Sequence, residues 1–90
     1  MRYHKPFTLV QRQQANAAYR SFVKTFNDMR FEFPPVNRQQ RALRNEYRQA
    51  VRDFARMLAA KDVRVDVDAL NTAQDRASEI AIEYAVARLR

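Results

Sequence analysis

Residues 37–60, NRQQRALRNEYRQAVRDFARMLAA, decide the fold of this chain. Their apolar side chains recur every three or four positions, which is the spacing of one face of an α-helix. Asn37, followed three residues later by Gln40, has the spacing of a helix-capping signal. The stretch therefore predicts an amphipathic helix over residues 38–60, whose apolar face contains Leu43, Tyr47, Ala50, Val51, Phe54, Met57 and Leu58.

Two further helices are predicted on either side of this one. Thr8 and Gln11 form a capping-box pattern before a first helix over residues 8–28, with apolar positions at Leu9, Ala15, Tyr19, Phe22, Val23 and Phe26. This helix should end before Pro34 and Pro35, which cannot continue it. Asp66 or Asp68 can cap a third helix that reaches nearly to Arg90, with an apolar face at Leu70, Ala73, Ala77, Ile80, Ala81 and Tyr84.

Two short segments alternate with a period of two, as extended strands do. They carry Met29, Phe31 and Phe33 in one case and Val63, Val65 and Val67 in the other. Two paired strands of this length have marginal stability unless helices cover them. A minimal two-stranded β element is therefore an alternative that the sequence leaves open. We predict a single all-α domain over residues 1–90, with three helices around one core and a flexible basic arm at residues 1–7.

Composition excludes several classes of protein. The chain has no cysteine, so disulfides and thiolate metal ligands are absent, which fits a reducing compartment. No apolar run indicates an export signal or a membrane span, and we expect a cytoplasmic protein. A formal net charge of +7 on 90 residues favours an acidic partner.

The basic charge concentrates on the helix over residues 38–60. Six arginines occupy an arc of about 120° and extend over about 27 Å, on a different side from the apolar face. The two acids of this helix, Glu46 and Asp53, lie beyond the apolar stripe from most of these arginines. No acid four residues away neutralises Arg44, Arg48 or Arg52. The face predicts an external anion and consists of Arg38, Arg41, Arg44, Arg48, Arg52 and Arg56.

Three explanations of this arginine face stay open. It can bind nucleic-acid phosphates, aided by further cations at Arg2, Lys5, Arg12, Arg20 and Lys24. It can bind an acidic protein surface. Alternatively, the third helix can lie beside the second and neutralise the arginines within the fold, through Asp75, Glu79 and Glu83 at four-residue intervals and Asp68 on or near its first turn. Surface ion pairs of this kind each contribute little to stability.

The sequence has few of the residues that a catalytic or cofactor site requires. There is no glycine for a phosphate-binding loop and no cysteine nucleophile, and the one histidine, His4, is near the N-terminus. Asp62, Asp66 and Asp68 lack the glycine and the final glutamate of a calcium-binding loop, so helix capping explains them better. We predict a protein that is not an enzyme and has no cofactor and no metal.

Two apolar groups could contact a protein partner. Phe31, Phe33 and Val36 place apolar surface in a connector, where they either close the core or form a docking patch. Ile82, Val86 and Leu89 lie on a flank of the third helix different from that of Ile80 and Tyr84, so they either join the core or form a homodimer contact.

Our leading prediction is a non-enzymatic basic protein that docks its arginine-rich helix on nucleic-acid phosphates, largely independently of sequence. The alternatives are a small adaptor, regulator or inhibitor that binds an acidic or nucleic-acid-handling protein, and a structural subunit of a helical oligomer.

Overall fold

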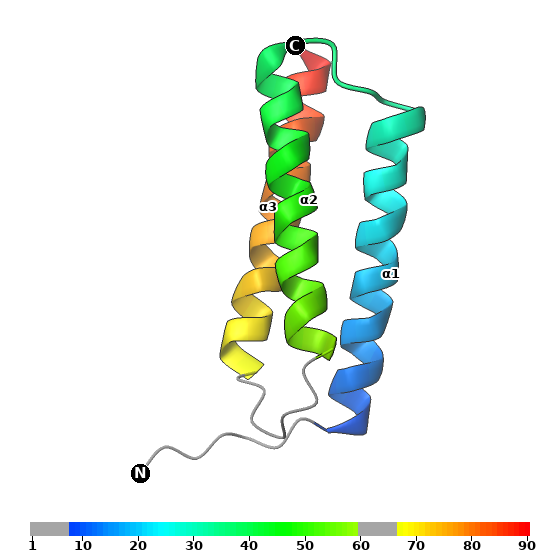
Figure 1. Ribbon diagram of the computed structural model, residues 1–90, viewed down its shortest axis with the longest axis vertical. Helices are drawn as coiled ribbons and strands as arrows, with labels where there is room; N and C mark the ends of the chain where they lie inside the picture. Colours follow the sequence, from blue (N-terminus) through cyan, green and yellow to red (C-terminus); the bar gives the residue numbers. More distant parts are fainter. Residues whose placement is uncertain (1–7, 60–66) are drawn as a thin grey trace.

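The computed structural model describes residues 8–59 and 67–90, which form three helices and, within these ranges, no strand. They are α1 (Leu9–Phe31), α2 (Arg38–Ala59) and α3 (Val67–Leu89). The helices run up, down and up in an elongated bundle with principal extents of 48 × 23 × 17 Å (Figure 1). α3 lies behind α2 in this view and is packed most closely against it, whereas α1 lies to one side and contacts mainly α2. The predicted all-α, three-helix architecture is confirmed.

Side-chain caps begin α1 and α2 where the sequence predicts them. The Thr8 hydroxyl accepts a hydrogen bond from the Gln11 amide, and the Gln11 side chain accepts one from the Thr8 amide, which completes a capping box. At α2, Asn37 Oδ1 accepts from the Gln40 amide at 2.8 Å. These bonds satisfy amides that have no partner inside their own helix, so both starts are set by short polar patterns.

The core forms where the three apolar faces meet. Tyr47 and Phe54 of α2 are completely buried, and the ring of Phe22 from α1 packs edge-on against both, with centroid separations of 6.3 and 5.5 Å. Such edge-to-face pairs add about 0.5–1.5 kcal/mol beyond the apolar area they bury. The buried apolar set is Ala15, Phe22, Met29, Tyr47, Ala50, Val51, Phe54, Leu70, Ala77, Ile80 and Tyr84.

The connector between α1 and α2 is held by the last turns of α3. Tyr84 donates its hydroxyl hydrogen bond to the carbonyl of Phe33, and Arg88 Nη1 donates to the carbonyl of Pro34 at 2.9 Å. Gln40, only 2% exposed, accepts from the Val36 amide and donates to the carbonyl of Ala87. Carbonyls and amides that a proline-containing connector cannot pair within itself are therefore paired by side chains from both neighbouring helices.

The prediction of a two-stranded β element is wrong for the described residues, which contain no strand. Met29 and Phe31 belong to α1, which continues to Phe31 instead of ending at residue 28, and Val67 is the first residue of α3. Val63 and Val65 lie outside the described residues. Met29 is buried seven positions after Phe22, so it continues the helical stripe, and an alternation over three residues could not distinguish this from a strand.

Two positions assigned to the apolar face of α1 are also wrong. Leu9 is 70% exposed and Val23 is 36% exposed. Leu9 is in the first turn of α1, and Val23 is displaced by about 100° from its buried neighbour Phe22. The buried arc of α1 is narrower than the sequence suggested, because α1 packs mainly against one helix.

Candidate nucleic-acid interface

The arginines of α2 lie on its outward side. Arg38, Arg41, Arg48, Arg52 and Arg56 are exposed, while Arg44 is half-buried. Phe54 and Tyr47, at the opposite side of the helix, are fully buried. The predicted separation of an arginine face from an apolar face is therefore confirmed, and the buried face fixes which way the arginines point.

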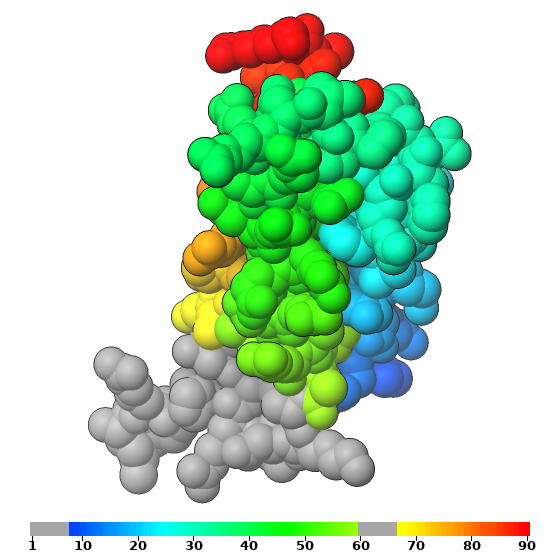
Figure 2. Space-filling model, turned by 45° about the horizontal axis from the view of Figure 1, so that its top comes forward, coloured from blue at the N-terminus to red at the C-terminus, as the bar shows by residue number. Residues whose placement is uncertain are grey.

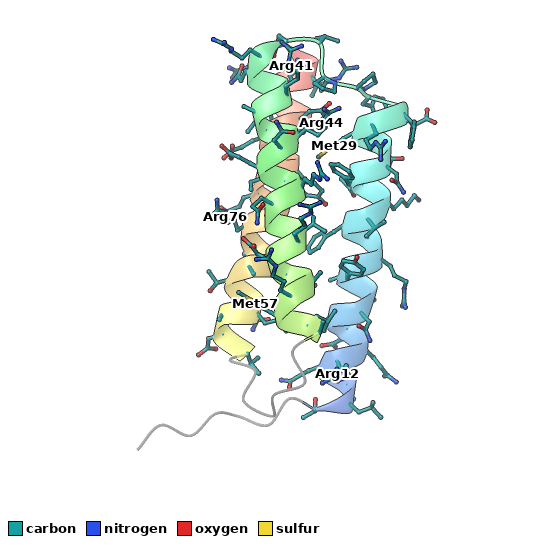
Figure 3. All side chains as sticks on the ribbon, viewed as in Figure 1. Arg12, Met29, Arg41, Arg44, Met57 and Arg76 are labelled. Atoms are coloured by element: carbon teal, nitrogen blue, oxygen red, sulfur yellow. The ribbon has the colours of Figure 1, made fainter. Side chains whose placement is uncertain are left out.

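Helix α1 places more arginines beside this face. The helices are antiparallel, so Arg12 lies near the end of α2 and Arg30 near its beginning (Figure 1). Arg12 and Arg30 are 18 residues apart, which is five turns at about 100° per residue, and therefore share one side of α1. In Figure 3, Arg12 and Arg44 lie between α1 and α2, whereas Arg76 lies on the other side of α2.

Arg30 is a residue that the sequence-based prediction of the interface missed. With α1 predicted to end at residue 28, Arg30 fell outside the helix; the five-turn spacing from Arg12 was the available signal. Its guanidinium lies 5.1 Å from the centroid of the Phe31 ring, and both side chains are exposed. We define the arginine face as the outward side of the α1–α2 pair that carries Arg12, Arg30, Arg38, Arg41, Arg44, Arg48, Arg52 and Arg56.

The described carboxylates of α1 and α2 lie on other sides of these helices. Asp28 borders a groove between α1 and α3, and Asp53 borders a cleft between α2 and α3. At about 100° per residue, Glu46 falls on the same flank of α2 as Asp53. Glu32 ends α1 as its C-cap residue. The fold therefore segregates charge, with the arginines facing outward and the helix carboxylates turned toward α3.

Asp75, Glu79 and Glu83 of α3 do not pair with the arginines of α2 in the described residues. Although α2 and α3 are neighbours, no ion pair joins Asp75, Glu79 or Glu83 to an α2 arginine in the described ranges 8–59 and 67–90. These acids project from the side of α3 that points away from the core or toward the Glu46 flank, as their helical spacing requires. Neutralisation of the α2 arginines by these three acids is thus not supported.

Arg44 differs from the other α2 arginines because its charge acts on Tyr84, the α3 residue that is bonded to the connector. Burial raises the pKa of the Tyr84 hydroxyl, and the positive charges of Arg88 and Arg44 partly offset this by favouring the phenolate. Burial also raises the pKa of Tyr47 to about 12, opposed by a side-chain hydrogen bond with Thr25. Both phenols are structural donors, to the carbonyls of Phe33 and Phe22 respectively.

The remaining predicted cations are less central. By helical spacing, Arg20 lies at the outer edge of the arginine face and Lys24 lies around the far side of α1, although both are exposed. Arg2 and Lys5, with the rest of the predicted arm, lie outside the described residues. Among the amides considered for base contacts, Gln40 is buried and Gln49 is bonded to Asp53.

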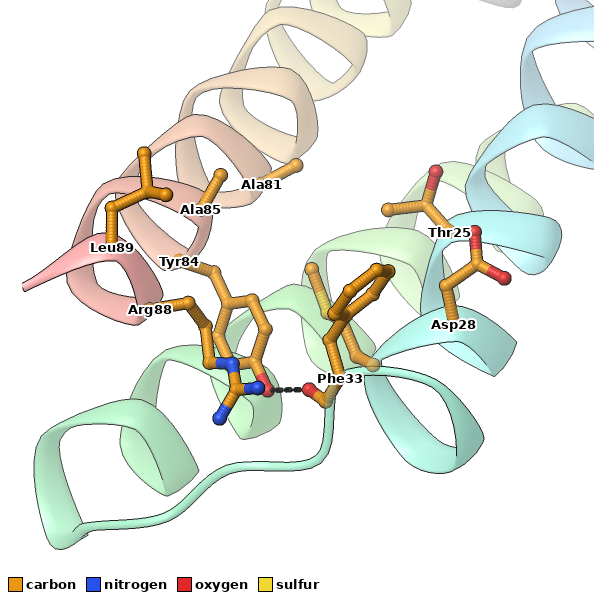
Figure 4. Close-up of a pocket in the computed structure, with 9 residues that line it drawn as sticks. Thr25, Asp28, Phe33, Ala81, Tyr84, Ala85, Arg88 and Leu89 are labelled. Atoms are coloured by element: carbon orange, nitrogen blue, oxygen red, sulfur yellow. Dashed lines mark hydrogen bonds between the residues drawn. The ribbon is translucent and has the colours of Figure 1, made fainter.

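The predicted apolar candidates are exposed. Phe31 is 71% exposed, Phe33 56% and Val36 71%, so these side chains do not close the core. Figure 4 shows Phe33 at a groove of about 340 Å³ between the ends of α1 and α3, with Ala85 and Leu89 opposite it. Ile82, Val86 and Leu89 are likewise exposed, so complete burial within one monomer is wrong for this flank of α3.

No three His, Cys, Asp or Glu side chains of residues 8–59 and 67–90 are grouped so as to hold a metal ion. Among the same residues, no helix combines the length and the apolar character needed to span a bilayer. No protein-family model, curated protein or solved structure matches this chain.

Proposed function

We propose that the protein binds nucleic-acid phosphates through the arginine face, without reading base sequence. The observation that carries this proposal is the segregation of charge: eight arginines share the outward side of α1 and α2, and the carboxylates of those helices lie elsewhere. The like charges along α2 have no acid four residues away at Arg44, Arg48 or Arg52, and repulsion of this kind destabilises an isolated helix. An external polyanion would remove that repulsion and is the chemistry that such a surface fits.

The dimensions of the face suit a phosphate backbone. From Arg38 to Arg56 the α2 stripe covers about 27 Å, which equals about eight nucleotide steps of about 3.4 Å. Arg12 and Arg30 extend the face onto the neighbouring helix, about 8–10 Å away between axes. Arginine offers two parallel donors to a phosphate and keeps its charge at all physiological pH values. The face can therefore contact several phosphates at once.

Mechanistically, the bundle acts as a preformed support. The arginines are fixed in direction because Tyr47 and Phe54 anchor the opposite side of α2. Binding then replaces condensed counterions on the nucleic acid with guanidinium groups, and the release of those ions drives association. No base edge needs to be reached, so we expect similar affinity for unrelated duplex sequences.

Titration of labelled duplex DNA and duplex RNA with the protein over a salt series tests this function. With about five phosphate contacts, the logarithm of the association constant should fall against the logarithm of salt concentration with a slope of about −4 to −5. The variant Arg41→Glu/Arg48→Glu/Arg52→Glu should lose binding and keep its helical circular dichroism, because all three side chains are exposed. Wild-type protein that binds neither duplex at about 50 mM salt refutes the proposal.

A matched pair of single variants separates the face from net charge. Arg48→Glu and Arg76→Glu change the total charge equally and both replace exposed residues, but Arg76 is on α3, away from the arginine face (Figure 3). Arg48→Glu should weaken binding several-fold more than Arg76→Glu. Equal losses would mean that overall charge, not this surface, attracts the nucleic acid.

The exposed connector favours a second candidate, a small adaptor or inhibitor that binds an acidic protein. Phe31, Phe33 and Val36 are each more than half exposed, and exposed apolar patches often mark protein contacts. In that case Phe33→Ser would weaken partner binding, whereas it should leave nucleic-acid binding unchanged. The two candidate functions therefore give opposite results with the same variant.

A further inference from the structure

The outer face of α3 is apolar only in its C-terminal half. Ile82, Ala85, Val86 and Leu89 are spaced as i, i+3, i+4 and i+7, and all four are exposed, Leu89 to 87% and Ile82 to 63%. Upstream, the same outward side carries Asn71, which is also exposed. Such a seam is the pattern of a helix that packs against another helix, yet the core residues Ile80 and Tyr84 occupy the opposite side.

This seam lies between two open grooves. On one side is the groove of about 340 Å³ toward α1, bordered by Phe33, Ala85 and Leu89 (Figure 4). On the other side, a groove of about 410 Å³ toward the start of α2 is bordered by Leu43, Ile82 and Val86. The end of α3 protrudes beyond its neighbours in Figure 2. A helix laid along the seam would therefore find apolar surface beneath it and toward α1, whereas the groove toward α2 is also lined by Asn37, Gln39, Glu83 and Arg90.

We propose that the occupant of this seam is the same seam of a second copy of the chain, packed antiparallel. An isologous contact requires a surface that is complementary to itself. In the register that sets Ile82 opposite the partner's Leu89, Ala85 faces the partner's Val86, so large residues meet at the ends and small ones in the middle. Leu89 borders the groove toward α1, so in this register it would lie toward the corresponding groove of the partner.

Charge complementarity supports this register and this occupant. At about 100° per residue, Glu79, Glu83 and Arg90 fall within about 40° of one another, on one flank of the seam. In the antiparallel register Arg90 is level with the partner's Ala81, midway between the partner's Glu79 and Glu83. Two-fold symmetry brings this flank of both copies to one rim of the contact, and each end of that rim joins one arginine to two carboxylates. A parallel pair would instead place the charged flanks of the two copies on opposite rims, where Arg90 of one copy would meet neither carboxylate of the other.

The dimer would turn its two arginine faces in opposite directions. Figure 1 shows α3 behind α2. By helical spacing, the seam is on the side of α3 away from the core, and the α2 part of the arginine face is on the side of α2 away from α3. Two nucleic-acid segments could then be held by one dimer. This consequence rests on the proposed function, whereas the dimer itself does not.

Sedimentation equilibrium without nucleic acid tests the dimer. Wild-type protein should show a concentration-dependent monomer–dimer equilibrium. Val86→Glu should raise the dissociation constant at least about thirty-fold, as loss of a central interface residue does, with helical circular dichroism retained. Asn71→Glu, which places a carboxylate on the same side of α3 outside the overlap, is the control and should leave the equilibrium unchanged. A monomer up to about 1 mM, or a dimer that Val86→Glu leaves intact, overturns the proposal.

A charge exchange tests the antiparallel register. Arg90→Glu and Glu83→Arg should each weaken self-association, whereas an equimolar mixture should form a heterodimer, because both ends of the charged rim then pair opposite charges. Failure of the mixture to associate better than either variant alone overturns this register. If Ile82→Ser also dissociates the dimer, a folding defect specific to Val86→Glu is excluded.

Bridging of two differently labelled duplexes distinguishes the two proposals. Wild-type protein should bring the duplexes together, and Val86→Glu should bind each duplex without joining them. A dimer that binds no duplex refutes only the proposed function, and a monomer that binds DNA refutes only the dimer.

Discussion

Replacing Gln40 should destabilise the bundle far more than replacing its neighbour Gln39. Gln40 is 2% exposed and is the only buried polar or charged side chain in the described ranges 8–59 and 67–90. Its Oε1 accepts from the Val36 amide at 2.9 Å, and its Nε2 donates to the carbonyl of Ala87 at 3.1 Å. One side chain thus joins the connector, the first turn of α2 and the last turn of α3.

The magnitude follows from these two bonds. Each contributes about 0.5–1.5 kcal/mol net, and a partner left unpaired in a buried place costs about 1–3 kcal/mol. Because Val36 is exposed, water can reach its amide more easily than it can reach the carbonyl of Ala87. We therefore expect Gln40→Ala to lower the free energy of unfolding by about 2–4 kcal/mol, and Gln39→Ala, at an exposed position, by no more than about 0.5 kcal/mol.

Urea unfolding, followed by circular dichroism, measures both values. Gln40→Glu separates the two bonds, because it keeps an acceptor for Val36 but places a carboxylate oxygen against the carbonyl of Ala87. Its loss of stability should therefore approach that of Gln40→Ala. Hydrogen exchange should also accelerate in the last turns of α3. Equal midpoints for Gln40→Ala and Gln39→Ala would refute the assignment of this contact.

Two further predictions concern the core. Phe54→Ala should cost about 3–5 kcal/mol because Phe54 is fully buried against Phe22, whereas Arg48→Ala should stay within about 0.5 kcal/mol of wild type; equal effects in urea unfolding would mean that the faces of α2 are misassigned. The raised pKa of Tyr47 gives stability that is full below its ordinary pKa of 10.0 and is lost as the pH rises toward about 12, because the unfolded chain ionises first. Between these values the wild type should lose about 1.4 kcal/mol per pH unit more than Tyr47→Phe, and parallel alkaline unfolding profiles would contradict this.

Local patterns were sufficient for the positions of the helices. The caps at Thr8 and Asn37 depend on residues three apart, and the stripe through Tyr47 and Phe54 depends on residues seven apart. These distances lie within one or two helical turns, so the chain specifies them without reference to any other segment. The same reasoning failed at Met29, Phe31 and Val67, where three alternating apolar residues are too few to separate a strand from a helix end.

The candidate interface also has one part that the sequence predicts and another part that depends on helix packing. The arginine face of α2 follows from the sequence, because one helix separates its own charged and apolar sides. Only the packing of α1 beside α2 brings Arg12 and Arg30 to that face. Only the packing of α3 decides that Glu79 and Glu83 stay apart from the α2 arginines and that Ile82, Val86 and Leu89 remain exposed. Periodicity reports which residues share a side of a helix, but the rotation of each helix about its axis is chosen by the fit of all three apolar faces in one core.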